Sequence, residues 1–378
     1  KSLLPFPGGS WRKLSCDSDC IFSRIIVYRE TSLYYTVPIN KREDCMMQKL
    51  ELYIHIPFCV QKCAYCDFLS APANDAARAE YVDALKKEIQ RYREVASSYQ
   101  VSSVFVGGGT PSILSCEQMG EIFKMLRQVL YFLGSIFILS YGQIEEIFKM
   151  LRQVFTIDRD AEITIEANPG TVTEEKLEGW KQARINRISF KLQSVNNEEL
   201  KMLGRIHTYE EFRESYDMAR QAGFDNINID LISAIPGQTV KSWENTLRTV
   251  AELHPEHISA YSLIIEEGTP FYERFAEDEQ IREEGGHPRL LPEEDVERQM
   301  YELTEAFLHT KGYERYEISN YAKPGYECRH NCGYWTRKDY LGLGLGASSL
   351  VEHQRFQNTS NLKEYLEQEY ISADQTCL

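Results

Sequence analysis

Residues 53–66 read Tyr53-Ile-His-Ile-Pro-Phe-Cys59-Val-Gln-Lys-Cys63-Ala-Tyr-Cys66, an apolar strand-like stretch that runs directly into three closely spaced cysteines. This C-x3-C-x2-C spacing puts three thiols on one short loop. Three thiolates can hold three corners of a four-iron four-sulfur cluster and leave the fourth iron open to chelate a small molecule. The stretch therefore predicts a [4Fe-4S] centre with Cys59, Cys63 and Cys66 as its metal ligands.

Two other uses of these cysteines stay open at this point. Zinc also binds Cys3His sets, with His55 as the fourth ligand, although zinc sites usually combine two spaced ligand pairs and no second pair lies nearby. A disulfide would leave one of the three cysteines unpaired, and disulfides are uncommon in reducing compartments. The iron–sulfur cluster is the favoured of the three hypotheses.

Length, composition and charge narrow the class of protein. The 378 residues, of which 43% are hydrophobic, suffice for one large α/β barrel or for two ordinary domains. A net charge of −15 disfavours broad attraction to nucleic acid or to an anionic membrane. The ten cysteines are dispersed apart from the one cluster, which favours reduced thiols in the cytoplasm over a disulfide framework.

Hydropathy argues against an integral membrane protein. A bilayer span needs roughly 20 apolar residues, and the nearest candidate, 130–139, is interrupted by Gly134 and Ser135. The opening segment lacks the basic region, apolar core and small-residue cleavage site of a secretory signal.

Strand-like and helical segments alternate along most of the chain. The expected strands are 50–56, 101–106, 162–166, 187–192, 226–232 and 257–263. The expected helices between them lie near 75–95, 117–129, 174–183, 209–222 and 241–253. Such β–α units in series predict parallel strands with right-handed crossovers. Because the candidate site residues follow the C-terminal ends of the strands, we predict a partial (β/α)6 TIM-like barrel.

Four regions are expected along the chain. Residues 1–45 lack clean periodicity and precede Met46-Met47, so we expect a disordered or non-native N-terminal segment. The barrel follows over 46–265 and contains a duplicated helix at 121–154, where nine residues recur letter for letter. An acidic linker or lid is expected over 266–292, and a truncated C-terminal region over 293–378.

Polar residues and glycines follow the ends of the expected strands. Gly107-Gly-Gly-Thr110 comes after the second strand, and glycines let the backbone come close to a ligand. Glu166, Gln193 and Asp230 end the next three strands, where they suit ribose hydroxyls and an ammonium group. Arg205 suits a carboxylate, because its guanidinium is permanently charged and bidentate. Taken singly, each also fits a tight loop, a strand-end cap or a surface salt bridge.

The order of these segments resembles the radical S-adenosylmethionine (SAM) superfamily, and within it the branch of oxygen-independent coproporphyrinogen III oxidases and HemW-type heme chaperones. The resemblance covers about 50–350 and implies that the open iron binds SAM. By matching motifs, it implies SAM contacts from Tyr53, Tyr65, Gly108, Gly109, Thr110, Glu166, Gln193, Arg205 and Asp230.

Two features favour the chaperone side of this branch. The oxidase typically carries a further cysteine where this chain has Phe68, and the segment His330-Asn-Cys-Gly-Tyr334-Trp335 is similar to a chaperone motif. The resemblance implies heme binding, with His330 as an axial ligand and Tyr334 and Trp335 as an aromatic wall. An ordinary hydrogen-bonded histidine is the alternative. We therefore expect a heme chaperone that passes heme to an acceptor protein, with decarboxylation of coproporphyrinogen III as the rival, enzymatic function.

Several positions depart from the family pattern. Arg184, Lys191 and Ala234 stand where relatives usually have glycine, and Ser233 stands where an aromatic residue is common. Lys191, two residues before Gln193, is expected to crowd the cofactor or to distort the strand end. A winged-helix-like C-terminal domain is expected to be largely missing.

Overall fold

The computed structural model describes residues 47–96, 98–115, 118, 155–371 and 376–377. The N-terminal segment 1–45 and the duplicated helix at 121–154 lie outside the described residues, and the expected helix 117–129 does so almost entirely. Those expectations therefore stay predictions.

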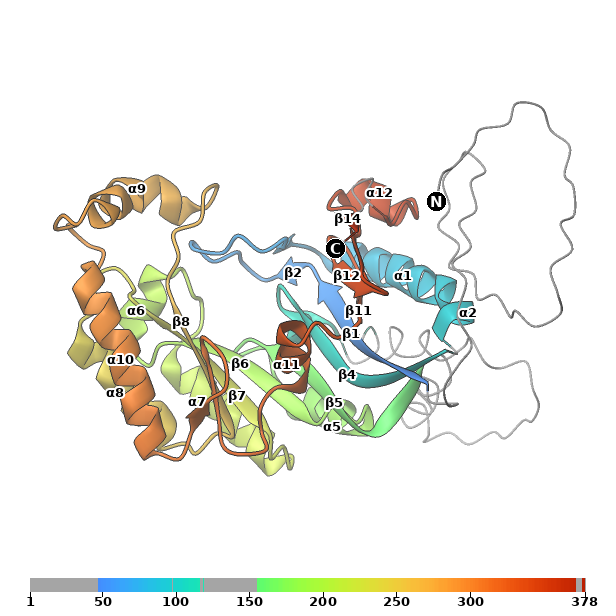
Figure 1. Ribbon diagram of the computed structural model, residues 1–378, viewed down its shortest axis with the longest axis horizontal. Helices are drawn as coiled ribbons and strands as arrows, with labels where there is room; N and C mark the ends of the chain where they lie inside the picture. Colours follow the sequence, from blue (N-terminus) through green and yellow to red (C-terminus); the bar gives the residue numbers. More distant parts are fainter. Residues whose placement is uncertain (1–46, 97, 116–117, 119–154, 372–375, 378) are drawn as a thin grey trace, which may run out of the picture. The chain divides into compact units, whose positions relative to one another are not determined.

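Six parallel strands form the centre of the fold and lie beside one another in chain order (Figure 1). They are β1 (Gln48–Ile56), β4 (Tyr99–Gly108), β5 (Thr156–Ala167), β6 (Arg187–Gln193), β7 (Ile227–Ser233) and β8 (His257–Ser262). Each overlaps one of the expected strands, so the predicted partial barrel is confirmed.

Helices connect these strands, and their ends follow from local sequence. They are α1 (Asp75–Arg91), α2 (Arg93–Ala96), α5 (Glu174–Gln182), α6 (Asn197–Met202), α7 (Tyr209–Gln221) and α8 (Val240–Ala251). At the start of α7 the Thr208 side chain accepts from the Glu211 amide while the Glu211 side chain accepts from the Thr208 amide, a capping box. Phe212, Tyr216 and Ala219 then recur on one face of α7 and are buried in the core.

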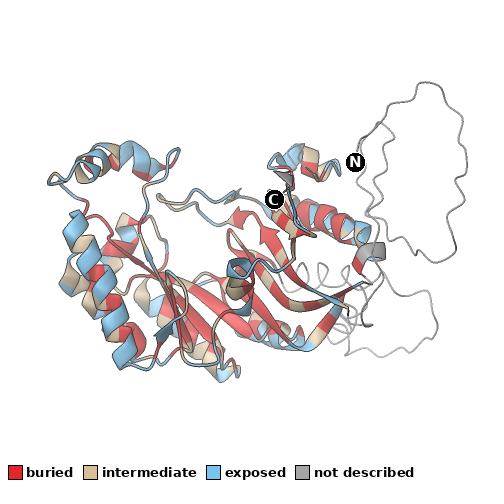
Figure 2. Cartoon of the chain, in the orientation of Figure 1, coloured by how far each residue is buried: buried red, intermediate tan, exposed pale blue. Residues whose placement is uncertain are grey.

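The two faces of the central strands differ in polarity. On β1, Leu50, Leu52, Ile54 and Ile56 belong to the hydrophobic core, whereas the alternate residues Glu51, Tyr53 and His55 face the other way. The other strands of the series repeat this pattern, and most of their residues are buried (Figure 2). The inner face of the curved sheet is therefore lined by polar side chains, which gives the barrel a site for chemistry along its interior.

The region after the barrel extends the same sheet at both edges. Helix α9 (Pro270–Glu283) lies within the segment expected to be a linker or lid, and α10 (Glu294–Thr310) packs on α8. The remaining elements are β9 (Glu314–Arg315), β10 (Asn320–Ala322), α11 (Arg329–Trp335), β11 (Tyr340–Leu343), β12 (Ser348–Val351), β13 (Gln354–Gln357), α12 (Leu362–Leu366) and β14 (Thr376–Cys377). Strand β10 pairs with β8, and β11 pairs in parallel with β1. Strands from both sides of residue 293 thus belong to one sheet.

No helix among the described residues is both long enough and apolar enough to cross a bilayer.

The positions where glycine was expected fall into two physical classes. Arg184 and Ala234 have φ angles of 55° and 58°, in the left-handed region that glycine adopts most easily. Lys191 does not have a positive φ, so glycine would matter there for space rather than for conformation. The pairing of β6 with β7 shifts register between Phe190 and Gln193, which agrees with the distorted strand end expected around Lys191.

Candidate functional site

The three cysteines lie on the loop that follows β1. Two short strands, β2 (Phe58–Cys59) and β3 (Ala71–Pro72), pair in parallel and join the two ends of this loop. Cys59, Cys63 and Cys66 are free thiols of intermediate exposure. Across the described ranges, no three Cys, His, Asp or Glu side chains already stand in a metal-binding group. The donor set nevertheless fits an iron–sulfur cluster by its chemistry, because three soft thiols lie within eight residues on one loop.

Two of the predicted ligand residues contact these thiols directly. The Thr110 hydroxyl donates to the Cys59 Sγ at 3.4 Å, and Arg205 Nη1 donates to the Cys63 Sγ at 3.4 Å. Asn168 Nδ2 in turn donates to the Thr110 hydroxyl at 2.8 Å. The cysteine loop, the glycine turn and Arg205 therefore meet at one place.

The glycine turn fits tightly between β1 and β5. A Cβ on Gly109 would lie 2.6 Å from the Phe58 carbonyl oxygen, and one on Gly108 would lie 2.6 Å from the His55 ring. Gly108 also has a φ of +107°, and its amide donates to Glu166 Oε2 at 3.0 Å. The glycines are therefore required by packing within the chain itself, a role that the sequence did not reveal.

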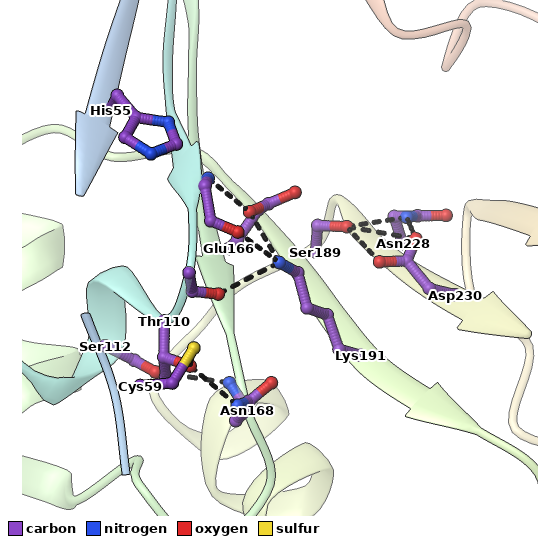
Figure 3. A network of polar contacts seen from close by, with 12 residues as sticks. His55, Cys59, Thr110, Ser112, Glu166, Asn168, Ser189, Lys191, Asn228 and Asp230 are labelled. Atoms are coloured by element: carbon purple, nitrogen blue, oxygen red, sulfur yellow. Dashed lines mark hydrogen bonds and ion pairs between the residues drawn. The ribbon is translucent and has the colours of Figure 1, made fainter. Parts of the chain in front are cut away.

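Lys191 reaches from β6 to the glycine turn and Glu166 (Figure 3). Its Nζ lies 2.8 Å from Glu166 Oε2 and donates to the carbonyl oxygens of Gly109 and Gly108 at 3.1 and 3.2 Å. Burial opposes the charge on this lysine, yet the adjacent Glu166 carboxylate holds its pKa above the ordinary value. The ammonium group is therefore protonated and fully hydrogen-bonded.

Arg205 lies at the centre of a second cluster of polar contacts. Its Nη2 donates to Asn168 Oδ1 at 3.0 Å and to the Lys191 carbonyl at 2.9 Å. Among the residues that the structure describes, neither Nε of Arg205 nor the buried Oε1 of Gln193 has a hydrogen-bond partner. Burial and the neighbouring Arg205 charge lower the pKa of His207 to about 3, so this imidazole is neutral. These two buried polar atoms, one on Gln193 at the end of β6 and one on Arg205 in the loop after α6, fit a site that takes a polar ligand.

Asp230 on β7 belongs to the same interior face. Asn228 Nδ2 donates to its Oδ1 at 2.6 Å, and the Ser189 hydroxyl donates to the same oxygen at 3.3 Å. Burial and the nearby Glu166 carboxylate raise the pKa of Asp230 to about 6. Asp230 and Glu166 thus place two acidic groups around the Lys191 ammonium.

The two predicted tyrosine contacts lie on different elements, Tyr53 on β1 and Tyr65 on the cysteine loop. The Tyr53 hydroxyl on β1 lies 3.0 Å from Nδ1 of His55, whose other ring nitrogen lies 2.9 Å from the Leu69 carbonyl. Tyr65, on the loop itself, packs against Phe271 with ring centroids 6.3 Å apart. Burial raises the pKa of Tyr65, although the Arg205 guanidinium opposes the shift.

His330 lies away from the cysteine loop, toward the start of the strands. Its two ring nitrogens lie 3.0 Å from the hydroxyls of Ser103 and Tyr334, and it is 2% exposed. Its Nδ1 lies 3.6 Å from Glu51 Oε2, and its ring also stacks against Tyr53 of β1 with centroids 6.4 Å apart. The cysteine loop begins after Ile56, about 10 Å further along β1 from Tyr53. Burial lowers the pKa of His330 to about 3, so it is a neutral histidine without a free nitrogen. Tyr334 and Trp335, at 40% and 60% exposure, are accessible.

Sequence reasoning missed one contributor to the site. Asn168 links Thr110 with Arg205, and its place two residues after Glu166 was the available signal. His330 and Tyr334 are four residues apart on α11, a spacing that brings side chains together on a helix and predicts their hydrogen bond.

Comparisons with known proteins agree with this geometry. The family model described as the radical SAM superfamily matches residues 53–250. A protein named heme chaperone HemW from Haemophilus influenzae is 36% identical over 332 residues, covering 85% of this chain and 77% of the relative. A heme chaperone HemW from Escherichia coli is 37% identical over 303 residues, covering 80% of this chain and 70% of the relative.

A solved structure is also similar. Coproporphyrinogen III oxidase (HemN) from Escherichia coli, described as a radical SAM enzyme, superposes with a TM-score of 0.69 and 27% identity. The match covers 88% of this chain and 72% of that structure.

Proposed function

Because this chain belongs to the radical SAM superfamily and, within it, to the HemW family, we propose that it binds a [4Fe-4S] cluster, SAM and heme, and passes heme to an acceptor protein. The observation that carries the proposal is the meeting of three elements: the cysteine loop, the Gly107–Thr110 turn and Arg205. A loop with three thiol donors therefore lies beside a group of polar side chains suited to a polar ligand. We propose the cytoplasm as its compartment, since the described cysteines are all free thiols.

In this proposal, Cys59, Cys63 and Cys66 would hold the cluster, which would supply an iron for SAM to bind and an electron for its reduction. The glycine turn, Glu166, Gln193, Arg205 and Asp230 orient the bound SAM. Tyr53 and Tyr65 complete the walls of that site. The residues of the chain itself bind and orient SAM and exclude water from the site.

The heme site is the less direct part of the proposal. We assign heme retention to the α11 region, where Tyr334 and Trp335 offer exposed aromatic faces. Ligation by His330 requires its ring to leave the hydroxyls of Ser103 and Tyr334. Ligation of heme iron by His330 is therefore expected to be accompanied by a change of its side-chain conformation.

The proposal is tested by anaerobic reconstitution with iron and sulfide. We expect about four irons for each chain and an electron paramagnetic resonance spectrum of the reduced cluster that changes when SAM is added. Cys59→Ala should abolish the cluster, while the matched change Cys332→Ala, at a cysteine of similar exposure outside the loop, should leave the iron content unaltered. An iron content that is unaffected by Cys59→Ala would refute the assigned ligands.

Heme binding is tested separately by titration with hemin and by the Soret band. His330→Ala and Trp335→Ala should weaken binding, whereas His353→Ala, at an exposed histidine outside α11, should not. Equal heme affinity in the wild type and all three variants would contradict the assignment of heme to the α11 region.

The similarity to coproporphyrinogen III oxidase supports a second candidate function, oxidative decarboxylation of coproporphyrinogen III. Phe68, 60% exposed at the edge of the cysteine loop, stands where the oxidases carry a further cysteine. Incubation of the reconstituted protein with coproporphyrinogen III, SAM and a reductant separates the two functions. Protoporphyrinogen formed over many turnovers would favour the enzyme.

A further inference from the structure

The strongest unexplained feature of the site is the position of the Lys191 ammonium. Three acceptors from two neighbouring strands surround its Nζ: the carbonyl oxygens of Gly108 and Gly109 on the glycine turn, and Oε2 of Glu166 on β5. The distances are 3.2, 3.1 and 2.8 Å. A primary ammonium has three N–H donors, so this set satisfies it completely.

The same three acceptors form a ready receptor for any primary ammonium that reaches them. Two are backbone carbonyls held in place by the turn, since the amides of Gly109 and Thr110 donate to the carbonyls of Ile56 and Phe58. The third is a carboxylate whose side chain is only 17% exposed. A fixed, poorly hydrated set of this kind binds a cation more strongly than an exposed carboxylate can.

The receptor also lies beside the cysteine loop. Thr110, the residue after Gly109, donates to the Cys59 Sγ, and the backbone carbonyl of Lys191 accepts from Arg205, which donates to the Cys63 Sγ. A ligand that enters the acceptor set is therefore within reach of both thiols. SAM carries one primary α-ammonium group, and its other cationic centre, the sulfonium, has no N–H to donate.

We propose that Lys191 occupies the α-ammonium subsite of the SAM site, as a tethered competitor that SAM must displace in order to bind. This inference rests on the proposed SAM binding and adds a regulatory element to it. The register shift of β6 between Phe190 and Gln193 is consistent with a side chain aimed into the site, because strand irregularities commonly re-aim one residue. An ion pair with a structural role alone would predict no competition.

Equilibrium dialysis of the anaerobically reconstituted protein tests the competition with two ligands. One is SAM, and the other is 5′-methylthioadenosine, which shares the nucleoside and sulfur but lacks the amino-acid part. Lys191→Ala should tighten SAM binding at least tenfold and should leave the affinity for 5′-methylthioadenosine within about twofold. The matched control is Lys176→Ala, since Lys176 Nζ also donates to two backbone carbonyls, those of Ser112 and Thr171, and SAM affinity should be unaltered there.

The outcomes separate this inference from the proposed function. Unchanged or weaker SAM binding in Lys191→Ala, with the wild type still binding SAM, overturns the competition and leaves the proposed function intact. An equal gain for both ligands overturns it too, because the lysine would then only obstruct the nucleoside. If neither protein binds SAM although the cluster forms, the proposed SAM binding itself fails and the competition falls with it.

A measurement on the wild type covers the case in which Lys191→Ala does not fold. Lys191 has a side chain only 13% exposed, so an amine-reactive label should modify it slowly in the free protein. Saturating SAM should expel the ammonium and accelerate labelling of Lys191 severalfold, as read by peptide mass spectrometry. Protection of Lys191 by SAM, or an unchanged rate, would contradict displacement.

Discussion

The carboxyl group of Glu51 gives a prediction that can be worked through quantitatively. Glu51 is 1% exposed, and neither of its carboxylate oxygens has a hydrogen-bond partner in the part of the chain that the structure describes. Lys338 Nζ lies 3.9 Å from Oε1, and Nδ1 of the neutral His330 lies 3.6 Å from Oε2. Burial raises the pKa of Glu51 from 4.5 to about 8, with Lys338 opposing and Glu162 adding to the shift.

The sign follows from proton uptake. Between pH 4.5 and about 8 the folded protein holds a proton on Glu51 that the unfolded chain has released, so stability falls as the pH rises through this window. The free energy of unfolding falls by about 1.36 kcal/mol for each pH unit within this window. Between pH 5 and pH 8, the titration of Glu51 therefore lowers it by roughly 3 kcal/mol. The loss is complete only above the folded pKa.

The change Glu51→Gln removes the titrating group at almost constant volume. Urea unfolding at pH 5, 6, 7 and 8 should show that the stability of the variant relative to the wild type increases with pH, by up to roughly 3 kcal/mol. The difference isolates Glu51, because all other groups titrate equally in both proteins. Glu178→Gln, at an exposed glutamate of α5, is the control and should run parallel to the wild type. Parallel stability curves for Glu51→Gln and the wild type would refute the reasoning.

Three further predictions concern packing and backbone. Ala234→Gly relieves a φ of 58° and should raise the thermal midpoint, with a gain of about 1 kcal/mol, whereas Ala219→Gly in the interior of α7 should cost at least about 1 kcal/mol. Trp243→Ala removes a fully buried indole whose Nε1 donates to the Thr304 hydroxyl at 2.8 Å. Chemical denaturation should therefore show that the free energy of unfolding falls by about 3–5 kcal/mol. A decrease below about 1 kcal/mol would mean that α8 and α10 do not pack as described. Thr208→Ala breaks the capping box of α7 and should cost about 1 kcal/mol, while Thr208→Ser, which keeps the hydroxyl, should restore most of it.

The barrel could be predicted because its signals are local. Six apolar runs separated by helical periodicity indicate β–α units, and the polar residues that follow each run indicate the edge where the site forms. The prediction of Cys59, Cys63 and Cys66 as cluster ligands uses the same kind of signal, their spacing within eight residues. Each of these inferences uses residues that are close together in the chain.

What could not be predicted depends on contacts between distant segments. The parallel pairing of β11 with β1 joins Tyr340 to Glu51, and nothing in either sequence specifies the partner. The position of Lys191 was expected to be crowded, but which acceptors its ammonium would reach depends on the turn after β4 and on Glu166 of β5. The burial of His330 likewise depends on Ser103, more than two hundred residues away in the chain.

The placement of β11 beside β1 also has a consequence during synthesis. The strand that leads into the cysteine loop acquires its second neighbour only when Tyr340 has left the ribosome, about 290 residues after Glu51. At translation rates of 5–20 residues per second, one edge of that strand therefore waits roughly 15–60 s without its partner. During this interval the nascent chain exposes an unpaired strand edge. Such an edge can pair with another chain and so promotes aggregation until β11 covers it.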